Sequence, residues 1–194
     1  TRFHAPARPG DTLELAVDIE SCDEESISYA GRASVGGRLV LELLDCLGPM
    51  LDATEFDDPA ALAADYAVLT GAGAPAGRFA GVAVPPLVDT GHDVGRRIDA
   101  KLAVPATAPF FTDHFPRRPV FPATLMLDAQ LRLARRVAQE ASAAPVRLSR
   151  ITNVKVRSFT SPGATLALYA ERVEAVAGGE IVVKVGAQAM GSDG

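Results

Sequence analysis

The stretch FFTDHFPRRPVFPATLMLDAQ, residues 110–130, joins a candidate central helix to two candidates for proton transfer. His114 stands in a proline-rich segment that leads into a long apolar run carrying Asp128. Proline is tolerated at the first helical position, so Pro122 and the periodic apolar residues after it predict a helix over 122–141. Histidine and aspartate both serve in general acid–base chemistry, which makes His114 and Asp128 a candidate pair.

The predicted helix is apolar around most of its first three turns. A helix that is apolar almost all round is a buried one, so we expect strands to wrap it. Alternating residues predict these strands at 97–104, 146–157, 165–175 and 180–189. The apolar positions of the helix are Leu125, Leu127, Ala129, Leu131, Leu133, Ala134 and Val137.

The first fifty residues have the texture of a sheet without helices. Strands are predicted at 2–7, 12–21, 27–35 and 38–44, and alternation along the second predicts a half-buried strand. Gly36-Gly37 supplies the positive φ angles of a two-residue turn and predicts a hairpin. The alternating apolar residues of the second strand are Leu13, Leu15, Val17 and Ile19.

The middle of the chain changes composition. Asp58 is a candidate N-cap for a short helix over 59–69, with Pro59 at its first position. The Gly-, Ala- and Pro-rich segment 71–86 predicts a linker. We therefore divide the chain into residues 1–50, 51–93 and 94–190, the middle part being a linker with a short helix.

A short repeat relates the two ends of the chain. PGDTLEL at Pro9–Leu15 returns as PGATLAL at Pro162–Leu168, an offset of 153 with five of the seven residues identical. In both copies a turn opens an alternating strand. Applied backwards, the offset puts the counterpart of the apolar helix before Thr1, so we expect residues 1–50 to be an incomplete unit.

The motif DHFPRRPVFPATLMLD resembles the HFPxxPVxPGxLxxE/D signature of the beta-hydroxyacyl-acyl-carrier-protein dehydratases, the FabA/FabZ-like hotdog dehydratases. ITNVKVRSFTSPGATL and RFHAPARPGDTL resemble the strand and turn that follow it. The resemblance covers residues 94–190 and, as the back half of a second copy, 1–46. It implies an α+β hotdog fold, an antiparallel sheet wrapped around a long buried helix. With the repeat it implies a double hotdog, the first unit incomplete.

Dehydration of a 3-hydroxyacyl thioester needs a base for the C2 proton and an acid for the departing hydroxyl. His114 is the candidate base. Asp128 is the candidate acid, because apolar neighbours disfavour its charged form. The N–H groups of Ala123 and Thr124, after Pro122, are candidate donors to the thioester oxygen. The family draws base and acid from opposite units, so the pair either shares one site or serves two half-sites.

Three residues depart from the family pattern. Ala123 replaces a glycine and adds a methyl group where substrate passes close to the backbone. Arg132 replaces a glutamine, and an Asp128–Arg132 pair at i,i+4 spacing favours the ionised carboxylate, so Asp128 is alternatively only an ion-pair partner. Ala164 replaces the aspartate of the second PGD turn.

Other candidates each have a structural alternative. Phe111, Phe115, Phe121 and Pro122 are candidate walls of the substrate site or, alternatively, core residues. His114 is alternatively a hydrogen-bonded loop residue. Arg117 and Arg118 are candidates for docking an acidic, phosphate-bearing carrier, or they form a solvated turn.

Composition excludes several other classes. The net charge of −5 and scattered arginines predict no nucleic-acid partner, and no apolar run is long enough for a membrane span. Cys22 and Cys46 lack metal-like spacing, which predicts no metal site and fits a reducing, cytoplasmic compartment.

These observations predict dehydration of 3-hydroxyacyl thioesters to trans-2-enoyl thioesters in fatty-acid or polyketide biosynthesis. No cofactor is expected beyond the phosphopantetheine arm that carries the substrate. The expected partners are an acyl carrier protein or acyl-CoA, and a second hotdog unit in a dimer or pseudo-dimer. Three alternatives stay open: a hotdog thioesterase, an enoyl-CoA hydratase, and a non-catalytic double hotdog that binds acyl carrier protein.

Overall fold

The computed structural model describes residues 1–73, 83–173 and 180–191. Its elements fall into two compact units, one formed by Thr1–Asp52 with Arg147–Lys155 and the other by Ala53–Val146 with Val156–Gly194. Each unit holds a four-stranded antiparallel sheet. The predicted α+β class is therefore confirmed, while the division at residues 50 and 93 stays a prediction.

The first unit is a meander with one short added strand. Its sheet has the order β1-β4-β3-β2. Gly36 and Gly37 have φ angles of 55° and 76° and turn β3 into β4, which confirms the hairpin. The predicted strand at 2–7 shrinks to two residues, because only Arg2 and Phe3 pair with β4. The strands are β1 (Arg2–Phe3), β2 (Glu14–Cys22), β3 (Ser26–Val35) and β4 (Arg38–Pro49).

The apolar face of β2 is exposed in this chain. Leu13, Leu15 and Val17 are 48%, 75% and 61% exposed, and Ile19 is 63% exposed. The alternation predicted the strand correctly, but the predicted half-burial is wrong here. Alternation reports which side chains share a face of a sheet and leaves open what packs on that face.

The predicted strand at 146–157 is also wrong. Residues 147–155 form no ladder and make one isolated bridge, between Arg150 and Arg2. Phe3 donates its N–H to Ser149 O at 3.1 Å, and Ile151 donates to Thr1 O at 3.1 Å. A ladder needs an equally long partner, and β1 offers only two residues.

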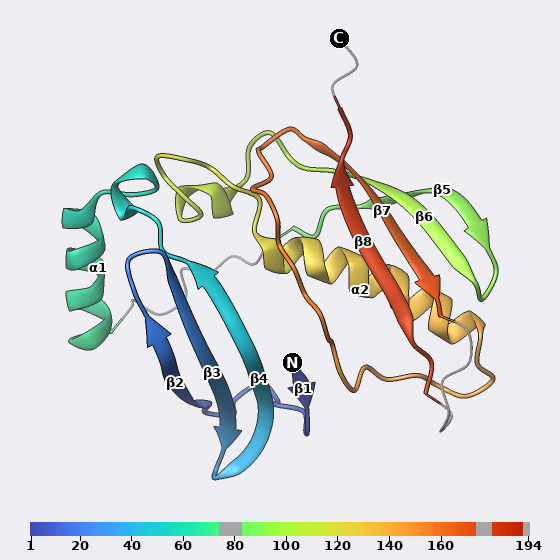
Figure 1. Ribbon diagram of the computed structural model, residues 1–194, viewed down its shortest axis with the longest axis horizontal. Coiled ribbons are helices and arrows are strands. Elements are labelled where there is room, and N and C mark those ends of the chain that lie inside the picture. The colour runs from blue at the N-terminus through green and yellow to red at the C-terminus, as the bar shows by residue number, and fades with distance from the viewer. Residues whose placement is uncertain (74–82, 174–179, 192–194) are drawn as a thin grey trace. The chain divides into compact units, whose positions relative to one another are not determined.

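The second unit contains the long helix, and its sheet has the order β5-β6-β7-β8 (Figure 1). Strand β5 lies in a region predicted as linker and was missed, because its sequence LVDTGHD has only two strongly apolar residues. Part of the predicted linker, residues 74–82, lies outside the described residues. The strands are β5 (Leu87–Asp93), β6 (Arg97–Ala103), β7 (Thr165–Arg172) and β8 (Val183–Ala189). The helices are η1 (Ala53–Glu55), α1 (Pro59–Thr70), η2 (Pro109–Thr112) and α2 (Ala123–Glu140).

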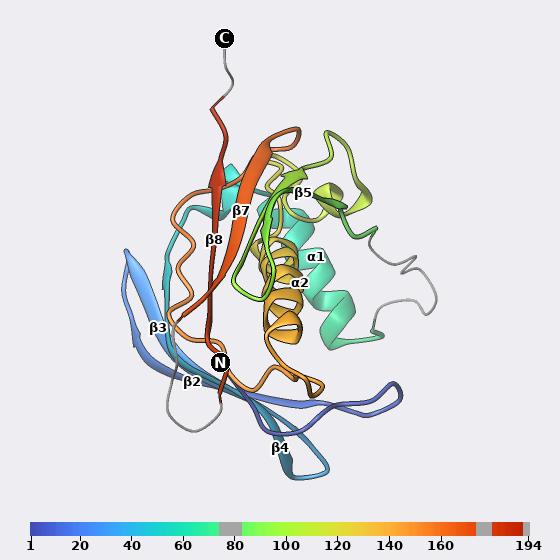
Figure 2. The same cartoon turned by 90° about the vertical axis from the view of Figure 1, so that its right-hand side faces the viewer.

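Helix α2 packs on one face of this sheet, against β6, β7 and β8 (Figure 2). Ala129, Leu133 and Val137 are fully buried there, and each of the two larger side chains contributes roughly 1.5–3 kcal/mol by leaving water. Leu127 and Leu131 remain partly exposed. The prediction that the helix is buried all round is therefore wrong for this chain, since the sheet covers one side of it. The arrangement is consistent with a hotdog unit.

Local chemistry sets the helix ends largely as predicted. The Asp58 side chain accepts a hydrogen bond from Ala60 N at 2.9 Å and caps α1. Helix α1 ends at Thr70, one residue beyond its predicted end, and buries none of its side chains. Pro122 is the N-cap of α2 and not its first residue.

Candidate active site

The loop that carries His114 is closed by backbone hydrogen bonds. His114 N donates to Phe110 O at 2.9 Å at the end of η2, and Val120 N donates to His114 O at 2.9 Å. The His114–Phe115 peptide bond is cis. The five residues between His114 and Val120 thus form a narrow loop directly before α2.

The ring of His114 is held in one tautomer. Its Nδ1 lies 2.9 Å from Val120 O, and a carbonyl oxygen can only accept, so Nδ1 carries the hydrogen. In the neutral ring the lone pair is then on Nε2, for which the described residues provide no hydrogen-bond partner. The Phe115 ring stacks on the imidazole, with 4.3 Å between centroids. The hydrogen bond therefore orients the ring of His114 and places the ring hydrogen of its neutral form on Nδ1.

The start of α2 leaves backbone donors unused. Leu125 N and Met126 N both donate to Pro122 O, at 3.0 and 3.2 Å. The N–H groups of Ala123 and Thr124 have no acceptor among the described residues. Because the N-terminus of a helix carries partial positive charge, these two groups are suited to an oxygen that gains negative charge.

Asp128 does not have the predicted desolvated environment. Its side chain is 50% exposed, and Arg132 Nε donates to its Oδ2 at 3.1 Å. A second nitrogen of Arg132 donates to Pro85 O at 3.0 Å. The expectation of desolvation is wrong for this chain, and the alternative, an i,i+4 ion pair, describes the structure. In the described part of the chain no hydrogen bond joins Asp128 to His114, so its acid role stays a prediction.

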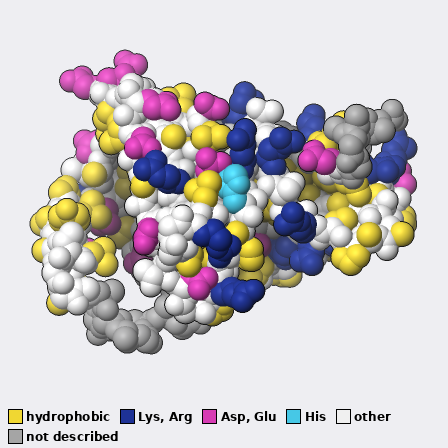
Figure 3. Space-filling view, turned by 90° about the horizontal axis from the view of Figure 1, so that it is seen from below, with side chains coloured by type: hydrophobic (Ala, Val, Ile, Leu, Met, Phe, Trp, Pro, Cys, Tyr) yellow, Lys and Arg dark blue, Asp and Glu magenta, His cyan; other side chains and the backbone are white. Residues whose placement is uncertain are grey.

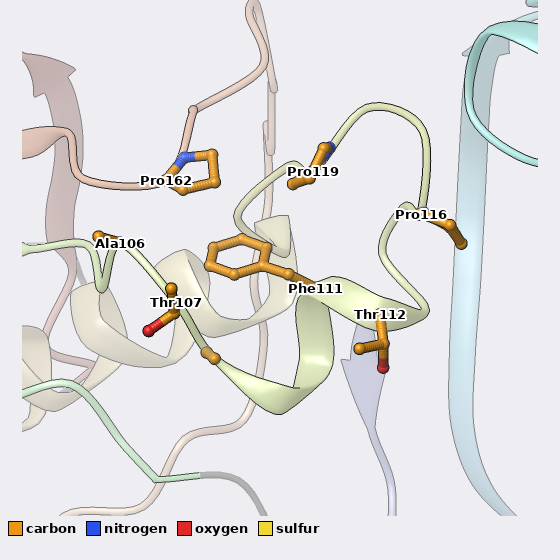
Figure 4. A pocket seen from close by; sticks show the side chains of 8 residues that line it. Ala106, Thr107, Phe111, Thr112, Pro116, Pro119 and Pro162 are labelled. Carbon is orange, nitrogen blue, oxygen red and sulfur yellow. The ribbon is translucent and has the colours of Figure 1, made fainter.

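Phe111 and Phe121 both belong to the buried core, and Phe111 also lines a pocket. Phe121 is 2% exposed and packs in the hydrophobic core, and Pro122 beside it is also buried. Phe111 is 8% exposed and points its ring into an open pocket of about 480 Å³ (Figure 4). The walls of this pocket are mainly apolar. They include Ala106, Thr107, Pro116, Pro119 and Pro162. A substrate role for the aromatic residues stays a prediction.

Arg117 and Arg118 are engaged by residues 54–58 of the same unit. Arg117 Nη1 donates to Thr54 O at 3.0 Å, and Arg118 Nη1 lies 3.0 Å from Glu55 Oε2. The Arg118 guanidinium also lies over the rings of Phe56 and Phe159, at 5.3 and 5.1 Å. The arginines are thus more than a solvated turn, and their docking role stays a prediction. The sequence interpretation missed Phe56, a lone aromatic in the acidic run EFDD.

A second polar cluster ties β5 to the end of α2. Arg136 forms two hydrogen bonds to Asp89, at 2.6 and 2.9 Å, and this holds the pKa of Asp89 below its ordinary value. Glu140 accepts from Gly95 N at 2.9 Å and pairs with His92, so its pKa is also lowered, first by the backbone N–H. This cluster serves to hold the edge strand.

The described residues contain no group of three or more His, Cys, Asp or Glu side chains placed to hold a metal ion. In the same part of the chain, no helix is long and apolar enough to cross a membrane. On the face drawn in Figure 3, basic side chains lie in separate groups among acidic and hydrophobic ones.

A long helix packed on an antiparallel sheet, preceded by a loop that carries an oriented histidine, is the arrangement that the resemblance to the FabA/FabZ-like dehydratases implies. Residues 91–189, more than half of the 194-residue chain, match the ApeI-like family, described as ApeI dehydratase. The chain belongs to this family, which confirms the resemblance seen in the sequence.

A curated relative supports the same assignment. The chain is 34% identical over 82 residues to the 3-hydroxyacyl-[acyl-carrier-protein] dehydratase FabZ of Rickettsia felis. The match covers 40% of this chain and 57% of that protein. The chain thus spans a little over half the length of this relative.

Proposed function

We propose that this chain dehydrates 3-hydroxyacyl thioesters, carried on acyl carrier protein, to trans-2-enoyl thioesters in fatty-acid or polyketide biosynthesis. The observation that carries the proposal is the 2.9 Å hydrogen bond between His114 Nδ1 and Val120 O. This hydrogen bond leaves the Nε2 lone pair available, and the loop that carries the ring is followed directly by α2. The family and the acyl-carrier substrate in the relative's name support the same reaction.

In this reaction His114 Nε2 takes the C2 proton of the substrate. The electron pair of the C2–H bond becomes the C2=C3 double bond, and the C3 hydroxyl leaves with a proton as water. Negative charge on the thioester oxygen is stabilised by the free N–H groups of Ala123 and Thr124. The methyl group of Ala123 narrows the approach of the substrate to that backbone.

The acid that protonates the leaving hydroxyl comes from a second hotdog unit in this proposal. Asp128 is exposed and paired with Arg132, so it is poorly placed to hold a proton for His114. If a second unit supplies the acid, His114 and Asp128 belong to two different half-sites. Asp128 can then act as the acid of the second half-site once its ion pair with Arg132 is broken.

The first unit is the back half of such a hotdog. The repeated motif places Leu13, Leu15 and Val17 of the first unit at the positions that Leu166, Leu168 and Ala170 hold in β7. In β7 these positions are covered by α2, whereas in the first unit they are exposed. The two strands have the same apolar pattern, but only β7 is covered by a helix. This supports a double hotdog in which the first unit needs a helix of the α2 type to cover its apolar face.

No cofactor is proposed, because the phosphopantetheine arm of the carrier delivers the substrate. Arg117 and Arg118 are the proposed docking residues, half exposed at 48% and 50% of their side chains. A carrier would compete there with the acidic residues Glu55 and Asp58.

The test is incubation of the full-length protein with 3-hydroxyacyl-pantetheine thioesters of several chain lengths. The expected result is a rise in enoyl-thioester absorbance without release of free thiol. Thiol release without enoyl product would instead identify a thioesterase, and neither signal would identify a non-catalytic module. Faster turnover of CoA esters than of pantetheine and carrier thioesters would favour the hydratase alternative.

A further inference from the structure

A six-residue segment outside the family-matched range packs on the His114 loop. This segment, Ala53–Asp58, comprises η1 and the residues before α1, and it belongs to the same compact unit as the loop. The family match begins only at residue 91. The segment is therefore an addition to the matched part, and its contacts converge on the loop between His114 and Val120.

Backbone and charged groups fasten the segment to the loop. Arg117 donates its backbone N–H to Phe56 O at 3.0 Å and a side-chain N–H to Thr54 O at 3.0 Å. Arg118 pairs with Glu55 at 3.0 Å, and Arg117 lies 3.8 Å from Asp58. Hydrogen bonds to backbone carbonyls fix a position more tightly than exposed ion pairs do, because exposed pairs are screened by water.

The buried part of the contact is aromatic. Phe56 is 8% exposed and meets the Phe115 ring edge-on, with 5.2 Å between centroids. It also meets Phe159 at 5.7 Å, while the Arg118 guanidinium covers both Phe56 and Phe159. Edge-to-face pairs of this kind hold rings in a defined relative orientation. Phe56 thereby fixes the position of Phe115.

Phe115 in turn stacks on the imidazole of His114, with centroids 4.3 Å apart and planes 24° apart. Phe115 therefore packs on one face of the imidazole, and Val120 O accepts the hydrogen bond from its Nδ1. Together these two contacts restrict the orientation of the ring. Loss of the support behind Phe115 lets the stacked pair move, and the Nδ1–H bond to Val120 O weakens with it.

We infer that the segment Ala53–Asp58, through Phe56, positions His114 for the reaction. Phe56 is a positioning residue, since it touches Phe115 and not the reacting atoms. The inference rests on the proposed function for its kinetic readout. Its spectroscopic readout is independent of that function, because the tautomer of His114 is a property of the protein alone.

The main variant is Phe56→Ala in the full-length protein, with Phe56→Leu as a second variant that keeps bulk without the ring edge. The matched control is Tyr66→Ala on α1, which removes an aromatic ring that is 69% exposed. Pantetheine thioesters are the substrate, so that changes in carrier docking at Arg118 do not enter the rate. Thermal unfolding is recorded for each variant.

The first readout is the split between kcat and KM for enoyl formation. Phe56→Ala is expected to lower kcat by roughly 10- to 100-fold, the loss typical of a catalytic group displaced by about 1 Å. KM is expected to stay within about threefold, because Phe56 is not among the residues proposed to contact the substrate. Phe56→Leu is expected to fall between the alanine variant and wild type, and Tyr66→Ala to match wild type.

The second readout is the 15N spectrum of histidine-labelled protein at a pH where the rings are neutral. The chain has three histidines, so the His114 signals are assigned by comparison with His4→Gln and His92→Gln. Wild type is expected to show His114 with a protonated Nδ1 and an unprotonated Nε2. In the Phe56 variants the two shifts are expected to approach each other as the tautomers exchange.

The inference is overturned if folded Phe56→Ala and Phe56→Leu keep wild-type kcat and the wild-type His114 tautomer, whatever their thermal stability. If the alanine variant does not fold, the leucine variant decides by the same criteria. Enoyl formation that persists in His114→Ala defeats the role of His114 as the base instead, and absence of enoyl product with wild type defeats the proposed function. In that case the 15N shifts alone decide whether Phe56 positions the ring.

Discussion

Strands β2 and β7 share one sequence motif and have opposite surroundings. Leu166 and Leu168 of β7 are 2% exposed beneath α2, whereas their counterparts Leu13 and Leu15 in the first unit are 48% and 75% exposed. The motif therefore determines which face of a strand is apolar. Whether that face is buried depends on a helix supplied from elsewhere in the chain.

The largest effect on stability is expected when a leucine side chain is removed at equivalent positions of the two copies of the motif. Leu168→Ala is expected to lower the free energy of unfolding of its unit by about 2–5 kcal/mol, through lost burial and a cavity. Leu15→Ala in the same 194-residue chain is the matched control and is expected to change stability by less than about 0.5 kcal/mol, as exposed sites do. Denaturant unfolding measures both.

A loss from Leu15→Ala as large as that from Leu168→Ala would show that the face of β2 is covered in solution. The exposed face would then not distinguish the two units.

Glycines in the two sheets give a second, smaller contrast. Gly186 of β8 pairs with Tyr169, and a Cβ added there would overlap the tyrosine ring that Arg97 covers at 5.0 Å. Gly186→Ala is expected to cost about 1–3 kcal/mol, because the ring must give up its place under Arg97. Gly31→Ala in β3 meets atoms only at 3.6 Å or more, and we expect less than about 1 kcal/mol. Equal melting temperatures for the two variants would refute the contrast.

Acid should loosen the edge of the covered sheet. The pKa values of Glu140 and Asp89 are lowered in the folded state from ordinary values of 4.5 and 3.8. The unfolded chain then binds more protons, so this stabilisation is complete above the ordinary values and is lost as pH falls through the lowered ones. Glu140→Gln is expected to reduce the loss of unfolding free energy at acid pH by under about 1 kcal/mol, because water screens these exposed ion pairs.

Urea unfolding of wild type and Glu140→Gln, followed from about pH 6 to pH 3, checks this prediction. Glu24→Gln, at an exposed position, provides a control for loss of one carboxylate outside the cluster. Parallel stability curves for wild type and Glu140→Gln would show that the cluster contributes nothing to the acid response.

The smallest effect on stability is expected on the exposed side of α2, which does not face the sheet. Arg132→Gln removes the i,i+4 pair with Asp128 and is expected to cost only about 0.3–0.5 kcal/mol. Thermal unfolding at low and at high salt checks it, and the difference between variant and wild type should shrink as salt rises. A loss of several kcal/mol would mean that the bond of Arg132 to Pro85 O matters more than the ion pair.

Features with short-range causes were predictable from the sequence. The Gly36-Gly37 hairpin and the Asp58 cap depend on one or two residues, and both are confirmed. The proline-bounded helix α2 follows from periodicity over its 18 residues, and strands β6, β7 and β8 follow from alternation over seven or eight residues each. In each case the chemical cause lies within the element itself.

Features that depend on a distant partner were not predictable. The predicted strand at 146–157 forms only the Arg150 bridge, and the poorly patterned β5 pairs with β6. Apolar neighbours along α2 suggested a buried Asp128, but one covered face leaves that carboxylate in water. Phe56 stands alone in an acidic run, and only the fold brings it against Phe115.

Enoyl formation by matched histidine variants tests whether the loop of the second unit supplies the base. Wild type and His92→Ala are expected to convert 3-hydroxyacyl-pantetheine to the enoyl thioester. His114→Ala, folded to the same extent by thermal unfolding, is expected to lose at least about 10²-fold in kcat, the scale of a general base. Undiminished product formation by His114→Ala would show that His114 is not the base.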